Sequence, residues 1–291
     1  MGRTVVGVDG SVAARYALEW AAADVHLRPR RLHLLHACGW PLVDLPLGPD
    51  AYRLPASART REDVYALAEK MLADAASLVD PEIPVTTEIS SDLPGRALLA
   101  ASETADTVVV GSRGTGGFAG LLLGSVAEQV ASHGRCPVVV VRPAPAPHGP
   151  VVVGIDGSPA SLAALRYAAD QAVARGTLLR AVHAWRWPVS AGPGDQVPVV
   201  HDRAVPAVDE ERVLVEALAG LGAEFPDLTV ERRLIHGRAA PALLSAGSDA
   251  ALTVVGSRGR GGFTGLLVGS VSHQVLHHAA GPVAVVHANV H

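Results

Sequence analysis

An internal repeat is the feature that most restricts how this 291-residue chain can fold. The segment VVGVDGS around Asp9 recurs as VVGIDGS around Asp156, and residues 108–125 match residues 253–270 at 14 of 18 positions. A chain that carries the same motifs twice folds as two similar units, here each of roughly 145 residues, an ordinary domain size. We expect one domain at residues 1–143, a proline-rich linker at 144–149 and a second domain at 150–291.

Within each half, short apolar runs alternate with segments of helical spacing. The run after Arg3 is too uniformly apolar for a half-exposed strand, which is typical of a parallel strand covered on both faces, and Ser11 is a suitable N-cap for a helix. Repeated strand–helix units with right-handed crossovers predict an α/β fold. Specifically, we expect two tandem flavodoxin/Rossmann-like domains, each a five-stranded, parallel, doubly wound sheet of order 3-2-1-4-5. In the first half, strands are expected at 4–8, 32–37, 85–89, 107–110 and 138–141, with helices after Ser11 and near 62–79, 96–103 and 125–133.

The composition excludes several classes of function. Apolar residues make up 49% of the chain, charged residues 18%, and the net charge is -4, so neither disorder nor a continuous positive face for nucleic acid is expected. Lys70 is the only lysine, which excludes a Walker A loop and argues against a Schiff-base enzyme. Asp9 and Glu19 lie where a signal peptide would be apolar, and there is no long apolar run, so a cytoplasmic protein is expected. Cys38 and Cys136 are expected to be reduced core residues.

The second repeated motif has the form Gly-x2-Gly-x9-Gly-Ser and follows the predicted fourth strand of each half. Glycines let backbone amides approach phosphate oxygens, and a helix that begins at Gly-Ser offers free N–H groups to an anion. A glycine-rich turn without a ligand would explain a single copy, but the two copies agree in spacing. The motif residues are Gly111, Gly114, Gly124 and Ser125 in the first half and Gly256, Gly259, Gly269 and Ser270 in the second.

Asp9 and Asp156 follow the first strand of each half. Their carboxylates can accept hydrogen bonds from ribose hydroxyls or an adenine amino group, or they can simply cap the next helix. In the order 3-2-1-4-5, strands one and four flank the point where the strand order reverses, which is where ligands bind in such sheets. Asp9 and Gly111 would then face one crevice, and this favours a binding role.

On these motifs the chain resembles the tandem, UspA-like universal stress proteins of the nucleotide-binding type, over nearly its whole length. The resemblance implies an adenine nucleotide in each half, as ATP with or without Mg2+, and a regulatory role in the stress response. It implies that Asp9 with Ala37, and Asp156 with Ala184, hold the nucleoside. It also implies that the glycine motif holds ribose and phosphates, with backbone amides added by Val126 and Val271.

One departure from the family pattern concerns the turn before the third helix. The usual glycine is Gly237 in the second half, but Asp92 stands there in the first. A second difference between the halves is that Thr115 of the first glycine motif is replaced by Arg260 in the second. The added positive charge predicts unequal sites, the second holding the triphosphate more strongly.

The sequence predicts neither a metal site nor a catalytic residue. His273, His277 and His278 on the last helix are interpreted as structural, since no carboxylate or cysteine completes a ligand set. No Gly-x-Ser-x-Gly elbow and no Rossmann fingerprint is evident, so no catalytic residue is predicted. A slow Mg-dependent ATPase that uses the same sites is the alternative function. It is disfavoured because the loops offer no lysine and no evident general base.

The expected partners follow from the same features. Besides adenine nucleotide, we expect an unidentified signalling partner and a homodimer. The two halves are expected to pair through their last strands, 138–141 and 283–286, because a short apolar sheet edge favours pairing with another strand.

Overall fold

The computed structural model describes residues 2–39, 60–115, 122–144, 146, 148–186, 204–260 and 268–288. Residues 116–121 and 261–267, in the nine-residue spacers of the glycine motifs, lie outside the described residues, as do residues 145 and 147 of the expected linker.

The described elements of the first half alternate as expected. They are β1 (Gly2–Gly7), α1 (Val12–His26), β2 (Arg30–Ala37), α2 (Arg61–Ala76), β3 (Val85–Ser90), α3 (Pro94–Ser102), β4 (Thr107–Gly111), α4 (Ser125–His133) and β5 (Val138–Val141). Ser11 caps α1, and its hydroxyl accepts a hydrogen bond from the backbone N–H of Ala14 at 3.0 Å. Each expected strand and helix is present within a few residues of its predicted bounds.

The second half repeats this pattern with one additional short helix. Its elements are β6 (Val151–Gly154), α5 (Pro159–Ala174), β7 (Leu179–Trp185), α6 (Ala204–Leu218), α7 (Leu221–Glu224), β8 (Val230–His236), α8 (Ala239–Ala246), β9 (Leu252–Gly256), α9 (Ser270–His278) and β10 (Val283–Val286).

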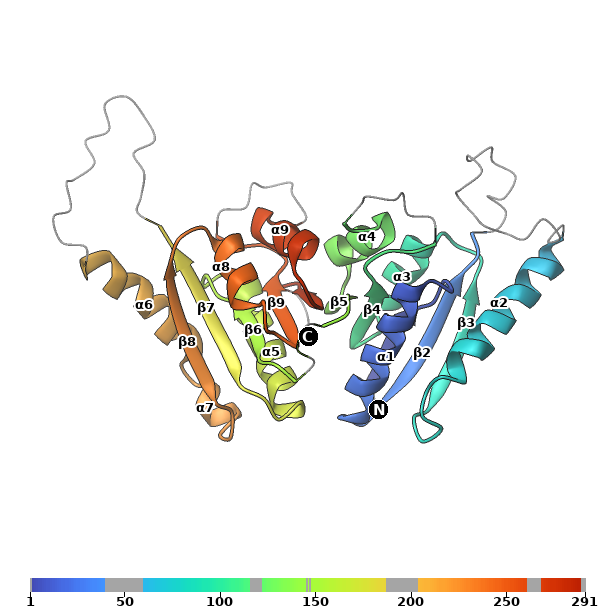
Figure 1. Ribbon diagram of the computed structural model, residues 1–291, viewed down its shortest axis with the longest axis horizontal. Helices are drawn as coiled ribbons and strands as arrows, with labels where there is room; N and C mark the ends of the chain where they lie inside the picture. Colours follow the sequence, from blue (N-terminus) through green and yellow to red (C-terminus); the bar gives the residue numbers. More distant parts are fainter. Residues whose placement is uncertain are drawn as a thin grey trace, which may run out of the picture.

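All ten strands belong to one sheet, in the order β3-β2-β1-β4-β5-β10-β9-β6-β7-β8 (Figure 1). Among the described strands, pairing is parallel within each half and antiparallel between β5 and β10. Counted within its own half, each set of five strands has the order 3-2-1-4-5. The predicted fold class, two doubly wound α/β domains, is therefore confirmed.

Helices cover both faces of the sheet, and the uniformly apolar strands bury alternate side chains on each. On β1, Val6 packs in a cluster with residues of α1, α2 and α5, whereas Val5 packs in a second cluster with residues of α3, α4, α8 and α9. Both clusters continue from one half into the other. Cys38 and Cys136 are free and buried, as expected, and burial raises the pKa of Cys136 to about 12.

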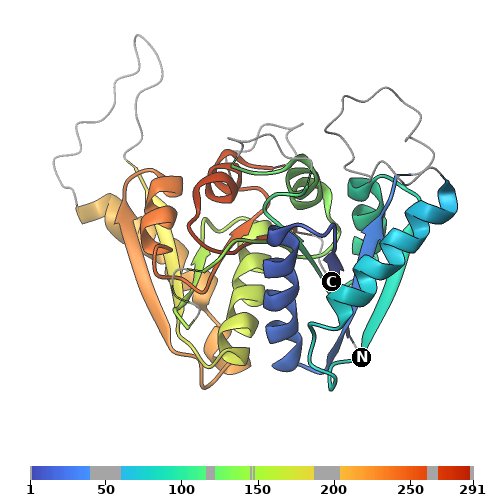
Figure 2. The same cartoon turned by 45° about the vertical axis from the view of Figure 1, so that its right-hand side comes forward.

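The expected pairing of the two last strands joins the halves. Val139 of β5 lies opposite Ala284 of β10, and these are equivalent positions of the repeat, 145 residues apart. The two halves are therefore related by an approximate twofold axis that passes through this strand pair. The same pairing brings α4 and α9 side by side above the centre of the sheet (Figures 1 and 2).

On the face of the sheet opposite to α4 and α9, α1 and α5 run next to each other (Figure 2). Arg175, after α5, donates to the carboxylate of Asp24 on α1 at 3.0 Å, and its guanidinium lies 5.0 Å from the centre of the Trp20 ring. Arg28, the equivalent of Arg175, pairs with Asp170 on α5 at 2.7 Å. Two charge pairs therefore cross between the halves, and the Asp24 side chain is completely buried.

Candidate functional site

The turn after the first strand of each half is tied to the glycine motif by an aspartate. Asp9 Oδ1 accepts from the backbone N–H of Ser11 at 3.0 Å, and its Oδ2 accepts from the backbone N–H of Thr115 at 3.0 Å. The Ser11 hydroxyl adds a contact of 3.4 Å to the carbonyl of Arg113. The predicted proximity of the Asp9 turn to the first glycine motif is therefore present. Both carboxylate oxygens of Asp9 hold backbone, however, and Ser11 rather than Asp9 is the helix cap.

The second half reproduces this arrangement almost atom for atom. Asp156 accepts from the backbone N–H of Ser158 at 2.9 Å and from that of Arg260 at 3.0 Å, and the Ser158 hydroxyl donates to the carbonyl of Arg258 at 3.2 Å. Burial opposes ionisation of Asp156, but these hydrogen bonds outweigh it and lower its pKa. The ionised carboxylate therefore stabilises the turn at neutral pH, and this contribution is lost as the pH falls through the folded-state pKa.

The first two glycines of each motif are required by the fold itself. A Cβ added to Gly111 would lie 2.5 Å from the carbonyl carbon of Ala13 in α1, and one added to Gly256 would lie 2.8 Å from that of Ala160 in α5. A Cβ on Gly114 would lie 2.5 Å from Asp9 Oδ2, and Gly259 is in the same position against Asp156. The missing Cβ at these glycines permits the close approach of a helix and of a carboxylate, a role distinct from the approach to phosphate that the motif predicts.

The third glycine of each motif is different. Gly124 and Gly269 are the N-caps of α4 and α9, and neither helix start has a side-chain cap. Among the described residues, a Cβ on Gly124 would meet no atom closer than 3.4 Å, and one on Gly269 no atom closer than 3.5 Å. Both have extended backbone angles that other residues can adopt. No described side chain therefore caps the N-terminal N–H groups of α4 and α9, which begin at Ser125 and Ser270, and such groups can bind an anion.

A histidine in each half orients the strand end next to the aspartate. The Nδ1 atom of His36 donates to the carbonyl of Val8 at 2.7 Å, and that of His183 donates to the carbonyl of Ile155 at 2.7 Å. These bonds hold β2 to the residue before Asp9 and β7 to the residue before Asp156. The next residues are Ala37, the last residue of β2, and Ala184, the last but one of β7.

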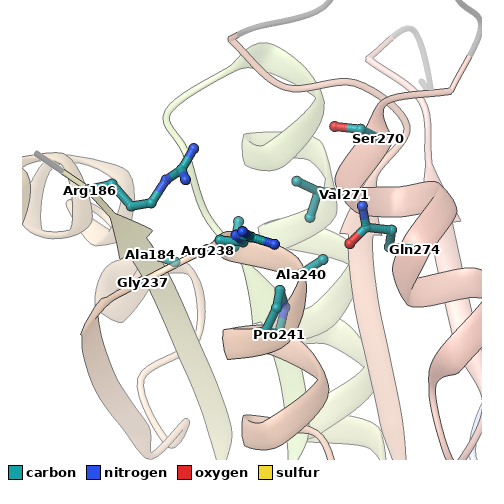
Figure 3. Close-up of a pocket in the computed structure, with 10 residues that line it drawn as sticks. Ala184, Arg186, Gly237, Arg238, Ala240, Pro241, Ser270, Val271 and Gln274 are labelled. Atoms are coloured by element: carbon teal, nitrogen blue, oxygen red, sulfur yellow. The ribbon is translucent and has the colours of Figure 1, made fainter. Parts of the chain in front are cut away.

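A cavity of about 330 Å³ lies at this end of the second half. Three predicted site residues, Ala184, Ser270 and Val271, line it, together with Gly237. Figure 3 shows Arg186 and Arg238 on the side of β7 and α8, with Ser270, Val271 and Gln274 of α9 across from them. The cavity is thus bounded by a helix N-terminus on one side and by two positive side chains on the other.

Sequence reasoning missed Arg186, Arg238 and Gln274. Arg186 follows β7 and Arg238 precedes α8, and neither has an arginine counterpart in the first half, where Gly39 and Leu93 stand, so the repeat did not indicate them. Gln274 does have a counterpart, Gln129, four residues after the final serine of the motif in each half. The presence of glutamine at this position in both halves was the sequence feature that pointed to Gln274.

The first half differs from the second at the corresponding place. Gly95 is the first-half equivalent of Ala240, which lines the cavity of the second half. The side-chain amide of Gln129 lies directly against Gly95. Asp92 donates its backbone N–H to the hydroxyl of Ser90 at 3.1 Å, and its carbonyl accepts from Gly39 at 3.1 Å. Asp92 therefore adds a negative charge to the turn at which the second half has Gly237. Val126 is partly buried against the core cluster beneath this region.

A second cavity, of about 620 Å³, lies between α1 and α2. Its lining includes Gly10, Ser11 and Met71 but none of the predicted site residues.

The histidines of α9 correct one expectation. No carboxylate is expected beside them from the sequence, but Glu128 of α4 lies 3.5 Å from His273, measured between Oε1 and Nε2. One ligand atom each of Glu128, His273 and His277 lie within 4.8 Å of one another. The reason is the β5–β10 pairing, which sets α4 against α9 although these residues are far apart in the chain. Burial and the neighbouring His273 lower the pKa of His277, so its ring is mostly neutral at neutral pH.

Comparison with known proteins gives a consistent result across the chain. A sequence model of the universal stress protein family matches residues 1–142 and 148–287. A universal stress protein of Mycolicibacterium smegmatis is 38% identical over 287 residues, covering 97% of this chain and 96% of the relative. A universal stress protein of Mycobacterium tuberculosis H37Rv is 37% identical over 292 residues, covering 97% and 95% of the two chains.

Among solved structures, a universal stress protein from Archaeoglobus fulgidus aligns with a TM-score of 0.64 at 20% identity and covers 98% of both chains. The similarity shows that the two proteins share the fold over both halves.

Among the described residues, no helix combines the length and apolar character needed to cross a membrane.

Proposed function

The chain belongs to the universal stress protein family, and we propose that it is a regulatory ATP-binding member with one adenine-nucleotide site in each half. In each half, the glycine motif and α4 or α9 would receive the phosphates, with or without Mg2+. The strand end after β1 or β6 would receive the nucleoside. Occupancy would then change the surface that the protein offers to a signalling partner.

One observation carries this proposal: the cavity of the second half lies at an uncapped helix N-terminus and is lined by three segments of the chain, two of which carry predicted site residues. Ala184 comes from β7, Gly237 from the turn after β8, and Ser270 from α9. Free N–H groups and the helix dipole attract phosphate at such a position. A cavity of about 330 Å³ is within the range of small-ligand sites.

The charges around the two sites support unequal affinities. Arg186 and Arg238 line the cavity of the second half, whereas the first half has Gly39 and Leu93 at these positions and Asp92 beside them. An anionic ligand would therefore bind the second half more tightly.

The alternative function, a slow ATPase, predicts sustained phosphate release that is lost when both sites are blocked. A regulatory binder predicts retained, unhydrolysed nucleotide.

Gly269→Asp is expected to weaken ATP binding to the second half at least tenfold relative to Gly269→Asn. Both residues are favourable N-caps, so α9 is retained in both variants. Only aspartate places a negative charge where the phosphates would bind. Isothermal titration with ATP measures the affinity, and thermal unfolding verifies that both variants are folded.

The matched pair Gly124→Asp and Gly124→Asn makes the same test in the first half. If the double variant Gly124→Asp/Gly269→Asp still bound ATP at two sites per chain, the assignment of both sites would be wrong. Denaturing the purified wild-type protein and identifying any released nucleotide provides an independent check.

Arg260→Thr is expected to weaken the second site about fivefold, corresponding to roughly 1 kcal/mol for a charge-assisted hydrogen bond. The Arg260 guanidinium lies against Gly157, directly after Asp156, whereas Thr115 stands in its place in the first half. The contribution should shrink as salt is raised. ATP titrations at low and high ionic strength test this, with Thr115→Ser in the first half as the control. An isotherm unchanged by Arg260→Thr would contradict the role of this arginine.

A further inference from the structure

Three side chains with metal-binding atoms meet above the strand pair that joins the halves. Glu128 comes from α4 of the first half, and His273 and His277 come from successive turns of α9 in the second. The two histidines are four residues apart and therefore share a helix face. Their ring centres are 4.3 Å apart, with the ring planes inclined by 31°.

The separations suit a small transition-metal ion. A tetrahedral Zn2+ lies about 2.0–2.2 Å from nitrogen and oxygen ligands, so its donor atoms are about 3.3–3.6 Å from each other. Glu128 Oε1 and His273 Nε2 are already 3.5 Å apart, and the full set of three donor atoms lies within 4.8 Å. The Glu128 and His273 side chains are about half exposed, at 47% and 52%, so small rotations can close the remaining distance.

His277 supplies an independent indication. Its Nε2 atom is buried and has no hydrogen-bond partner within the part of the chain that the structure describes. A buried polar nitrogen without a partner is costly, and a ligand would remove that cost. The nearby guanidinium of Arg142 is held by the carbonyls of Leu276 at 2.5 Å and Leu122 at 3.3 Å, so part of its hydrogen-bonding capacity is already used.

We propose that Glu128, His273 and His277 form a binding site for one divalent transition-metal ion of the zinc class, located between the two halves. Two imidazoles and one carboxylate are a donor set that Zn2+ favours, and solvent can supply the fourth ligand. Harder ions such as Mg2+ prefer oxygen ligands and would bind poorly.

The position of the site follows from the tandem architecture. Glu128 and His273 are equivalent residues of the two halves, 145 positions apart, and they meet on the approximate twofold axis. Two identical halves would place the same residue on both sides, whereas the divergence of this chain puts a carboxylate opposite an imidazole. A bound ion would cross-link α4 and α9, the two helices whose N-termini form the proposed phosphate sites. The metal site does not depend on nucleotide binding.

Titration of the tag-free, full-length protein with Zn2+ alone tests the proposal. We expect one ion per chain and a higher melting temperature in the presence of Zn2+. Binding should weaken at least tenfold in Glu128→Gln and in His273→Ala. With Co2+ as the probe, the visible absorption of a low-symmetry, four-coordinate ion should appear in the wild type and be lost in both variants.

His278→Ala is the matched control, because His278 lies on the same helix, is exposed, and has its ring centre 6.4 Å from that of His277. It should bind Zn2+ as the wild type does. The proposal is overturned if Zn2+ does not bind, or if binding and the Co2+ spectrum survive in Glu128→Gln and His273→Ala. An equal loss of binding in His278→Ala would also overturn it.

Discussion

Arg175→Met is expected to lower the free energy of unfolding by about 3–5 kcal/mol, because it leaves a buried carboxylate without its counter-ion. Asp24 is completely buried, and its Oδ1 accepts a hydrogen bond from Arg175 at 3.0 Å. Its Oδ2 has no hydrogen-bond partner among the described residues. Methionine retains an apolar contact with Trp20 but supplies neither charge nor donor. Urea unfolding, followed by circular dichroism, measures the loss.

The matched control is Arg28→Met, the same substitution at the equivalent position of the first half. The partner of Arg28, Asp170, is 52% exposed and can be hydrated when the arginine is removed, so the expected loss is about 1 kcal/mol or less. Adding Asp24→Leu to Arg175→Met should recover much of the stability, since it removes the stranded charge. Equal losses in Arg175→Met and Arg28→Met would show that the burial of Asp24 is not the cause.

The fold could be predicted from the sequence because its main determinants are local or repeated. Uniformly apolar runs such as Val138–Val141 indicated strands covered on both faces, and the duplicated motifs indicated two similar domains. The pairing of β5 with β10 also followed, because a short apolar edge strand is stabilised by a partner. Each of these inferences required only the residue pattern and a general rule about sheets.

The candidate site was predicted less completely, because its details depend on contacts between distant segments. The approach of Asp9 to Gly114 and of α1 to Gly111 exists only once strands one and four are adjacent. The residue pattern therefore indicated the glycines, but it could not show that Gly111 and Gly114 also pack against α1 and Asp9. The meeting of Glu128 with His273 requires the pairing between the halves as well, so the histidines were interpreted without their carboxylate partner.

Gly111→Ser is expected to destabilise the first half by about 3 kcal/mol or more, whereas Gly124→Ser should leave its stability within about 0.5 kcal/mol. The Cβ of a serine at 111 would lie 2.5 Å from the carbonyl carbon and 2.6 Å from the carbonyl oxygen of Ala13. Both are backbone atoms of α1, so relief requires the whole helix to move away from β4. At 124 the nearest described atom is 3.4 Å from the added Cβ, and serine is a better N-cap than glycine.

Comparing Gly111→Ser with Gly124→Ser distinguishes two roles of glycine within the motif, helix packing and ligand binding. If the first glycine serves helix packing and the third serves the ligand, Gly111→Ser lowers the unfolding midpoint with or without ATP. Gly124→Ser then changes ATP affinity while the ligand-free protein unfolds as the wild type does. Urea unfolding of both variants, with and without ATP, distinguishes these effects. Equal stability of the two ligand-free variants would contradict the packing role of Gly111, and the fixed spacing of the motif would then need an explanation from the ligand alone.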